Sequence, residues 1–327
     1  MTCSSRDFFS HFHKAMSFQQ RGVGLVELMI GLVLGLFLIA GIIQIYLGSK
    51  SSYRVTEGMS RLQENARYAM TVIGRELDAA SYMGCRGVTP VDNILSNQAG
   101  EYDFNTVLTG SDGASGAPDV FSVKRAVGID IPLVQKTKEA GVYSAIELDV
   151  TAPGYEALKQ YQVLLISDCN KASVFMITND PTTSNGTVEY DTSTTSPVGQ
   201  SNVKSMNYQF VTGGTDLEQS KGVDSVATVF RTQSSTFDIN NERLRLNGED
   251  LVEGVSDMQV EYGFPSSGNT KYVSAASVTA SDWPLVKAIR VTLVFDTVEA
   301  VTPSNQKINR TYTTTFRLRN HDPADES

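Results

Sequence analysis

Histidine is scarce in this chain of 327 residues, and its placement leaves little for chemistry. His11 and His13 lie within the first 22 residues, and His321 lies close to the C-terminus. Histidine is the commonest general base and metal ligand in proteins. The sequence also has no glycine-rich phosphate loop or dinucleotide-binding fingerprint. We therefore expect a protein that is not an enzyme, with no catalytic residue, no metal and no cofactor.

The sequence also lacks an excess of basic residues. The chain has 27 Lys and Arg against 36 Asp and Glu, a formal net charge of −9. Binding to phosphates needs a basic face, so nucleic acid is excluded as the expected partner. One acidic stretch, residues 238–250, offers the oxygen ligands that calcium prefers, without the spacing of an EF-hand. Two interpretations of this stretch remain: a calcium-binding loop and a solvated hairpin edge.

A long apolar run stands near the N-terminus, from Val23 to Leu47, with Glu27 as its single charge. About 20 apolar residues are enough for a helix to cross a bilayer. A charge within such a helix costs roughly 2.5–3.5 kcal/mol on insertion scales, and less near the interface. Glu27 therefore indicates either a function or a position at headgroup depth in a signal peptide or simple anchor.

The residues around Glu27 favour a function. The stretch from Arg21 through Gly22 and Val23 to Glu27, behind a short basic leader, resembles the prepilin signal of type IV pilins and type II secretion pseudopilins. The resemblance implies that prepilin peptidase cuts between Gly22 and Val23 and methylates the new amine of Val23, where the family most often has Phe. Glu27 is then the fifth mature residue, the assembly contact that neutralises this amine in a neighbouring subunit.

The helical pattern continues beyond the apolar run, and no proline precedes Pro90. Apolar residues recur at three- and four-residue spacing, which predicts one amphipathic face: Val55, Met59, Leu62, Ala66, Ala69, Ile73 and Leu77. We expect one helix from about Val23 to about Met83, with Gly84 as its stop. A free coiled coil is the rival interpretation of this stretch.

The rest of the chain predicts strands, rich in β-branched and aromatic residues. Predicted strands cover residues 121–127, 145–150, 161–167, 173–178, 206–211 and 226–231. Three later stretches alternate between apolar and polar residues, as in an antiparallel sheet with one buried face: residues 257–264, 289–295 and 312–318. Asn247-Gly248 predicts a tight hairpin turn. The fold class is therefore α+β, with the amphipathic half of the helix packed on an antiparallel sheet, as in a type IV pilin.

Two stretches near the C-terminus are similar to the PilW family of minor pilins: residues 251–262, beginning Leu251-Val252-Glu253-Gly254-Val255, and residues 310–320. The resemblance implies a minor pilin that helps to initiate type IV pilus assembly and sits in or at the tip of the filament, in machinery for adhesion, twitching motility or DNA uptake. A J-like minor pseudopilin of type II secretion is the nearest alternative. A membrane-anchored periplasmic binding or enzymatic domain is the third.

The resemblance also implies the domain plan and the partners. Residues 1–22 are a cleaved leader, residues 23–84 the long helix, membrane-spanning to about residue 47, and residues 85–327 a β-rich domain in the periplasm. The expected partners are prepilin peptidase, other minor pilins and the major pilin through the helix, a tip adhesin, and inner-membrane lipid before assembly. The implied final location of the mature protein is a pilus on the cell surface.

Cysteine is as scarce as histidine: Cys3 falls within the leader, leaving Cys85 and Cys169. In an oxidising periplasm such an even pair is most simply a disulfide, and two separate buried thiols are the alternative. Polar loops are expected between the strands at residues 111–118, 179–202, 213–224 and 265–270. The Thr- and Ser-rich loop 179–202 is predicted to be mobile.

Overall fold

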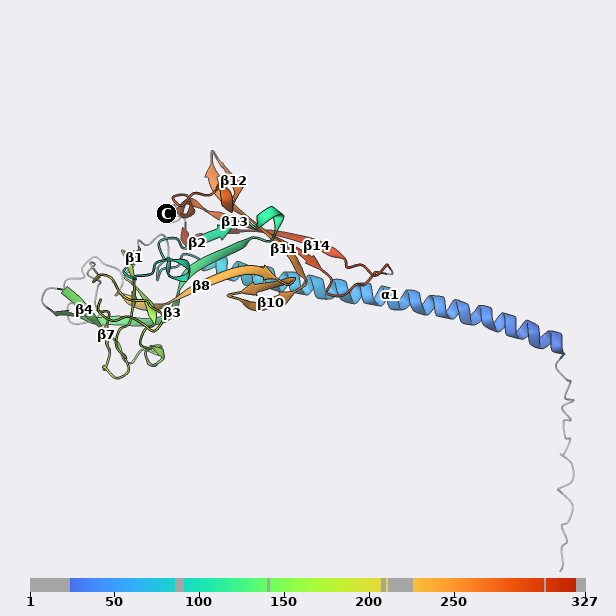
Figure 1. Ribbon diagram of the computed structural model, residues 1–327, viewed down its shortest axis with the longest axis horizontal. Helices are drawn as coiled ribbons and strands as arrows, with labels where there is room; N and C mark the ends of the chain where they lie inside the picture. Colours follow the sequence, from blue (N-terminus) through green and yellow to red (C-terminus); the bar gives the residue numbers. More distant parts are fainter. Residues whose placement is uncertain are drawn as a thin grey trace, which may run out of the picture. The chain divides into compact units, whose positions relative to one another are not determined.

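The computed structural model describes residues 24–85, 91–139, 142–206, 210, 226–302 and 304–321. Its contacts divide the chain into two compact units, Met1–Arg54 and Val55–Ser327. Helix α1 (Leu25–Asp78, 54 residues) contributes to both units (Figure 1). The second part of α1, from Val55 onward, belongs to the unit Val55–Ser327, which we call the β-rich unit. The amphipathic pattern of this part predicts that it packs on the strands of that unit.

The buried face of α1 is the predicted one from Leu62 onward. Leu62, Ala66, Ala69, Ile73 and Leu77 are all buried, whereas Val55 and Met59 are half-buried. The helix ends at Asp78, before the predicted stop at Gly84. The reason is that the following segment turns to pair with a strand: the N–H of Ser81 donates to the carbonyl of Lys124 at 3.0 Å, and the carbonyl of Tyr82 accepts from Ala126.

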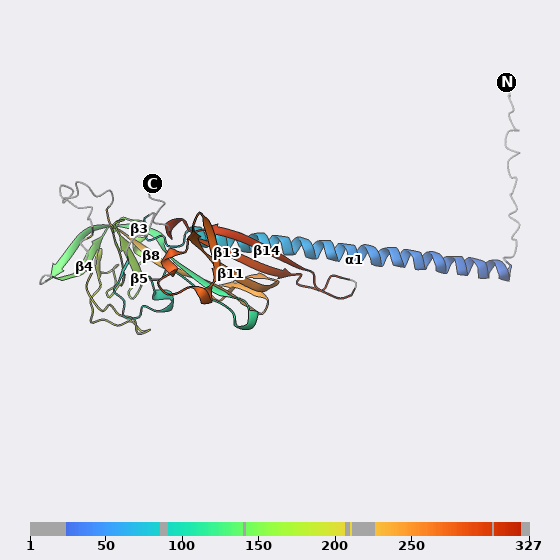
Figure 2. The same cartoon turned by 90° about the horizontal axis from the view of Figure 1, so that it is seen from above.

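A four-stranded antiparallel sheet packs on this helix, with β11, β13 and β14 beside it in Figure 2. The strand order in this sheet is β12-β11-β13-β14. Its strands are β11 (Val255–Ser266), β12 (Asn269–Ser274), β13 (Ala288–Asp296) and β14 (Asn309–Arg317). The predicted alternation is confirmed, because Ile289, Val291, Leu293 and Phe295 are fully buried and join the core cluster that contains the helix face. The α+β fold class is thereby confirmed.

A ten-stranded sheet forms the rest of the β-rich unit, with the main order β1-β6-β5-β8-β3-β4-β7. All its pairings are antiparallel except that of β1 with β6. Its strands are β1 (Val91–Asn93), β2 (Leu108–Ser111), β3 (Val120–Glu139), β4 (Val142–Leu148), β5 (Val163–Ser167), β6 (Ala172–Met176), β7 (Thr187–Glu189), β8 (Thr228–Asn240), β9 (Arg243–Leu246) and β10 (Glu249–Glu253). Short 3-10 helices connect elements of the chain at Gly100–Tyr102, Ala114–Gly116, Tyr155–Ala157, Ala275–Ser277, Trp283–Leu285 and Arg319–His321.

The Asn247-Gly248 turn joins β9 to β10 as predicted. Both residues have positive φ, 54° and 83°, which a type I′ turn requires. The Asn247 side chain also accepts the N–H of Thr236 at 2.8 Å and donates to the carbonyl of Ser234 at 3.0 Å. The turn is therefore fixed to strand β8 as well as to its own hairpin.

Four predictions, for three loops and one strand, need correction or fall outside the described residues. The stretch 179–202, predicted as a mobile loop, contains β7 and buries Val188, Tyr190 and Asn202. Residues 265–270, predicted as a loop, are mostly the ends of the β11–β12 hairpin. Of the predicted strand 206–211, only Met206 and Phe210 are described, and neither lies in a strand. The predicted loop 213–224 lies outside the described residues.

Short polar side chains explain why the stretch 179–202 is ordered. They hydrogen-bond the nearby backbone, so a Thr- and Ser-rich sequence makes a series of turns. Asp191 accepts the backbone N–H groups of Ser193 and Thr194 at 2.8 and 2.9 Å, together with both hydroxyls. Burial raises the pKa of Asp191, but these hydrogen bonds outweigh it and hold the pKa well below its usual range.

The backbone of Gly110, in β2, lies directly against the large buried side chain of Tyr262. A Cβ at this position would stand 1.8 Å from the Tyr262 hydroxyl oxygen and 2.6 Å from its Cζ. Tyr262 cannot swing away, because it is 1% exposed and packs edge-to-face on Trp283 with ring centroids 4.8 Å apart. This contact joins β2 to β11 of the other sheet, and Trp283 belongs to the same buried core cluster as Tyr262.

We expect Gly110→Ala to lower the free energy of unfolding by about 3 kcal/mol, since overpacking a filled core commonly costs this much. Urea unfolding of the full-length chain in detergent measures it. Tyr262→Phe is the partner variant. It removes a buried hydroxyl for which the described residues supply no hydrogen-bond partner, so it should be nearly neutral alone and should recover part of the loss when combined with Gly110→Ala. An unaffected Gly110→Ala variant would show that the two sheets separate easily here.

Candidate membrane and assembly segment

The candidate site is the first part of α1, from Leu25 to Leu47. This stretch has the length and apolar composition to cross a membrane, and none of its residues is buried. Large side chains lie open along it, such as Leu25 at 76%, Phe37 at 73% and Ile45 at 75% exposure. Exposed apolar surface of this extent is unstable in water, so a lipid or protein environment must cover it.

Glu27 is the single charged residue of this stretch and lies in the first helical turn. It is exposed, and the first backbone bond of the helix, from Leu28 N–H to Gly24 carbonyl at 3.1 Å, stands beside it. The first N–H groups of a helix have no partner within it and carry partial positive charge. A carboxylate in the first turn is therefore favoured locally and remains open to a cation from another molecule.

The predicted cleavage and methylation residues, Gly22 and Val23, lie outside the described residues. Three glycines of the apolar stretch are described: Gly31, Gly35 and Gly41 have open space where a Cβ would stand. Small residues at this spacing permit close approach by another helix. The helix thus offers a smooth apolar surface with one carboxylate near its start.

A charged residue that the sequence pattern did not single out fixes the second part of α1 to the strands of the β-rich unit. Glu76 is 2% exposed and accepts hydrogen bonds from Arg125 Nε at 3.2 Å and from Ser235 Oγ at 2.8 Å. Arg125 lies on β3 and Ser235 on the paired strand β8. A detectable signal was present, because Glu76 falls on the apolar helix face, three residues after Ile73.

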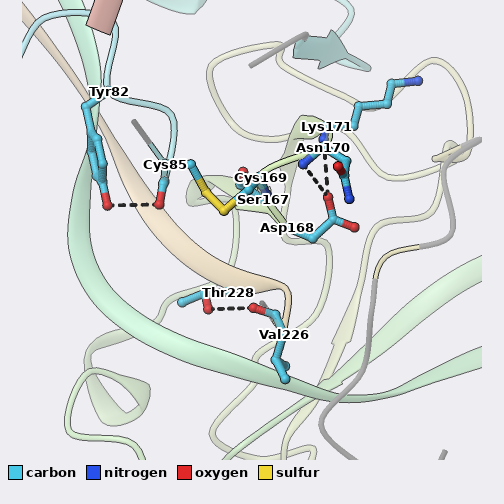
Figure 3. Close-up of a disulfide and its surroundings, with 10 residues drawn as sticks. Tyr82, Cys85, Ser167, Asp168, Cys169, Asn170, Lys171, Val226 and Thr228 are labelled. Atoms are coloured by element: carbon cyan, nitrogen blue, oxygen red, sulfur yellow. Dashed lines mark hydrogen bonds between the residues drawn. A yellow bond between two sulfur atoms is a disulfide. The ribbon is translucent and has the colours of Figure 1, made fainter. Parts of the chain in front are cut away.

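The disulfide between Cys85 and Cys169 fixes the chain just beyond α1, as the sequence predicts, with the two Cα atoms 5.3 Å apart (Figure 3). Cys169 lies in the β5–β6 turn, where Asp168 Oδ1 accepts the N–H groups of Asn170 and Lys171 at 3.1 and 3.2 Å. The Tyr82 hydroxyl donates to the carbonyl of Gly84 at 2.9 Å. Burial raises the pKa of Tyr82, so this phenol stays a donor. The helix end is therefore held covalently and by hydrogen bonds.

Three acidic residues of the hairpin 238–250 pair with basic neighbours. Arg245 pairs with Asp238, Arg243 pairs with Asp250 at 3.2 Å, and Lys307 pairs with Glu242 at 2.6 Å. Within the described part of the chain, no group of three or more His, Cys, Asp or Glu side chains is arranged to hold a metal ion. The ion pairs are contacts that a solvated hairpin edge would make.

Together these features define a class: an α+β protein whose N-terminal helix has the length and composition to cross a membrane. Residues 218–326 match the family model described as PilW, Type IV Pilus-assembly protein W. The match includes every strand from β8 to β14 and supports a relation to the PilW family and a part in type IV pilus assembly. No curated protein and no solved structure matches the chain.

Proposed function

We propose that this protein is a minor pilin, a non-enzymatic filament subunit that helps to initiate type IV pilus assembly and sits in or at the tip of the pilus. The observation that carries the proposal is the exposed apolar stretch Leu25–Leu47 with Glu27 as its single charge. A simple anchor needs no carboxylate, and an assembly contact does. The family match at residues 218–326 supports the same function independently of the helix.

The proposed sequence of events follows from the chemistry of the N-terminus. The protein waits in the inner membrane with its β-rich part in the periplasm. Prepilin peptidase cuts between Gly22 and Val23 and methylates the Val23 amine, leaving a cation in an apolar environment. Glu27 of one subunit then pairs with the Val23 ammonium of a neighbour, because an unpaired charge in hydrocarbon is costly. Other minor pilins and the major pilin are the proposed neighbours, and a tip adhesin is a proposed cargo.

The printed description of the matching family names type IV pilus assembly, which favours a pilus over the pseudopilus of type II secretion. The β-rich unit fits a tip position, because its two sheets would be bulky in a regular filament lattice.

The test compares wild type, Glu27→Ala and Gln44→Ala in cells with and without prepilin peptidase. Gln44 is the matched control, an exposed polar residue in the same apolar stretch. Intact mass and N-terminal sequencing should find methylated Val23 only when the peptidase is present. We expect Glu27→Ala to be cut but to fall roughly tenfold or more in sheared filaments, corresponding to the loss of one buried ion pair. Gln44→Ala should assemble normally.

Two outcomes contradict the proposal. A chain that retains Met1 to Gly22 in the presence of the peptidase rules out processing. Equal recovery of Glu27→Ala and Gln44→Ala in filaments rules out the assembly contact, even if processing occurs.

A further inference from the structure

The apolar stretch of α1 ends in a polar segment that carries two tyrosines and a lysine. After Leu47 the helix continues through small and polar residues, 48–52, with Lys50 among them, and then Tyr53. Tyr46 and Tyr53 are 63% and 68% exposed, and Lys50 is exposed as well. Tyrosine is enriched where a membrane-spanning helix meets the lipid headgroups, and lysine near a helix end extends its ammonium group to the same layer.

Tyr46, Lys50 and Tyr53 lie on one face of the helix. Lys50 follows Tyr46 by four positions and precedes Tyr53 by three, and side chains at these spacings are neighbours on a helix with 3.6 residues per turn. A tyrosine joins an apolar ring to a polar hydroxyl, and a lysine joins an apolar stem to a charged end. This face therefore suits the layer between hydrocarbon and water.

The spacing between Glu27 and Lys50 matches the thickness of a bilayer. No charged residue stands between them, and they are 23 positions apart on one continuous helix. At 1.5 Å per residue this spacing is about 34 Å. The hydrocarbon core of a bilayer is about 30 Å thick, and about 40–45 Å with its headgroups. With Glu27 at headgroup depth on one side of the membrane, Lys50 therefore lies at headgroup depth on the other.

The sequence around Lys50 favours a lipid over a second copy of the chain. No carboxylate stands between Glu27 and Glu57, so the helical neighbours of Lys50 include none. A second copy in the same membrane and orientation would lie at the same depth, and would bring no carboxylate to Lys50 from this part of its helix. Acidic phospholipids do carry negative charge in this layer and attract basic residues near the membrane surface.

We propose that Tyr46, Lys50 and Tyr53 bind the headgroup of an acidic phospholipid, and that this contact fixes the depth of α1 while the protein is in the membrane. Lys50 pairs with the lipid phosphate, and the two tyrosines place their rings at the edge of the hydrocarbon and their hydroxyls among the headgroups. The inference rests on the membrane stage of the proposed function, but it needs neither cleavage of the leader nor assembly of a filament.

The test uses the full-length chain in phosphatidylcholine vesicles that contain a minor share of phosphatidylglycerol with a photoreactive headgroup. Peptide mass spectrometry then locates the crosslinks. We expect them at residues 46–54, and we expect Lys50→Gln to lower their yield roughly fivefold, the effect of one cation near the surface. Lys50→Arg should restore the yield, because it keeps the charge. Arg67→Gln, at an exposed arginine later on α1, is the matched control and should leave the yield unchanged.

Four outcomes overturn the inference. Equal crosslinking of wild type and Lys50→Gln removes the lysine from the contact, and equal crosslinking by a photoreactive phosphatidylcholine removes the preference for acidic lipid. Loss of the crosslinks on adding soluble glycerol phosphate would mean a site for free phosphate. Loss of the crosslinks at a high ratio of protein to lipid would assign this face to a second copy. An unchanged crosslink pattern in the double variant Tyr46→Leu, Tyr53→Leu contradicts the part assigned to the tyrosines.

Extraction with alkaline carbonate separates a failure of this inference from a failure of the proposed function. A chain that carbonate removes from the vesicles has not inserted, which contradicts the membrane stage of the proposed function as well. A chain that stays in the vesicles without crosslinks at residues 46–54 contradicts this inference alone.

Discussion

Replacing both Cys85 and Cys169 with serine should lower the free energy of unfolding by about 4 kcal/mol. The disulfide closes a loop between residues 84 positions apart, and the chain-entropy model gives roughly 4–5 kcal/mol for a loop of this length. The native contacts around it should survive, because Ser81 and Tyr82 keep their backbone hydrogen bonds to β3. The loss therefore acts mainly through a less restricted unfolded state.

Urea unfolding of the full-length protein in detergent measures this effect, with the single tryptophan, Trp283, as the fluorescence probe and far-UV circular dichroism as the second. Cys3→Ser is the matched control, since Cys3 is outside the bonded pair and should leave stability unchanged. Wild type under reducing conditions should resemble the double variant. A double variant as stable as wild type would mean that the reduced unfolded chain already holds these segments together.

Arg125→Met should cost about 3–5 kcal/mol, the range found when one partner of a buried ion pair is removed. Glu76 is 2% exposed, and Arg125 donates to both of its carboxylate oxygens, at 3.2 and 3.3 Å. Without Arg125 the carboxylate keeps Ser235 and the longer contact from Gln233 at 3.4 Å. The one cation left is then Arg75 of the helix itself, which is largely exposed and stands 3.7 Å from the carboxylate, so no cation joins Glu76 to the sheet and the second part of α1 should loosen from β3 and β8.

A double-mutant cycle separates the charge from the packing. Glu76→Met combined with Arg125→Met should recover most of the lost stability, because a buried ion pair can often be replaced by apolar groups of similar volume. The cycle is read from urea unfolding and from amide exchange within residues 62–77 of α1. Additive losses in the double variant would show that Glu76 and Arg125 act separately, and would refute the buried pair as the attachment of the helix.

The sequence predicts the buried face of α1 well because that face repeats with the helix period. Leu62, Ala66 and Ala69 point to the core for that reason alone. It predicts the Asn247-Gly248 turn because two consecutive residues with positive φ need these residue types. It fails for residues 179–202, where low complexity suggests mobility. Burial of Tyr190 and turns made by Asp191 order that stretch instead.

The candidate site divides in the same way. Leu25–Leu47 and Glu27 are evident from composition, because a long apolar run with one carboxylate needs no knowledge of the fold. The attachment of α1 by Glu76 is not evident, because its partners Arg125 and Ser235 lie 49 and 159 residues away in the chain. A charge on an apolar helix face is a signal that something pairs with it, but the sequence does not say what.

The amino-acid sequence by itself therefore determined the long helix, its apolar first part, the alternating strands and the cysteine pair, since each depends on local period, composition or a count of residues. Only the tertiary structure decided where α1 ends, which strands are neighbours and why Gly110 has no side chain. These depend on which distant segments meet in space. Burial, hydrogen bonding and steric contact between distant segments decide these features, and no single position in the sequence encodes such contacts.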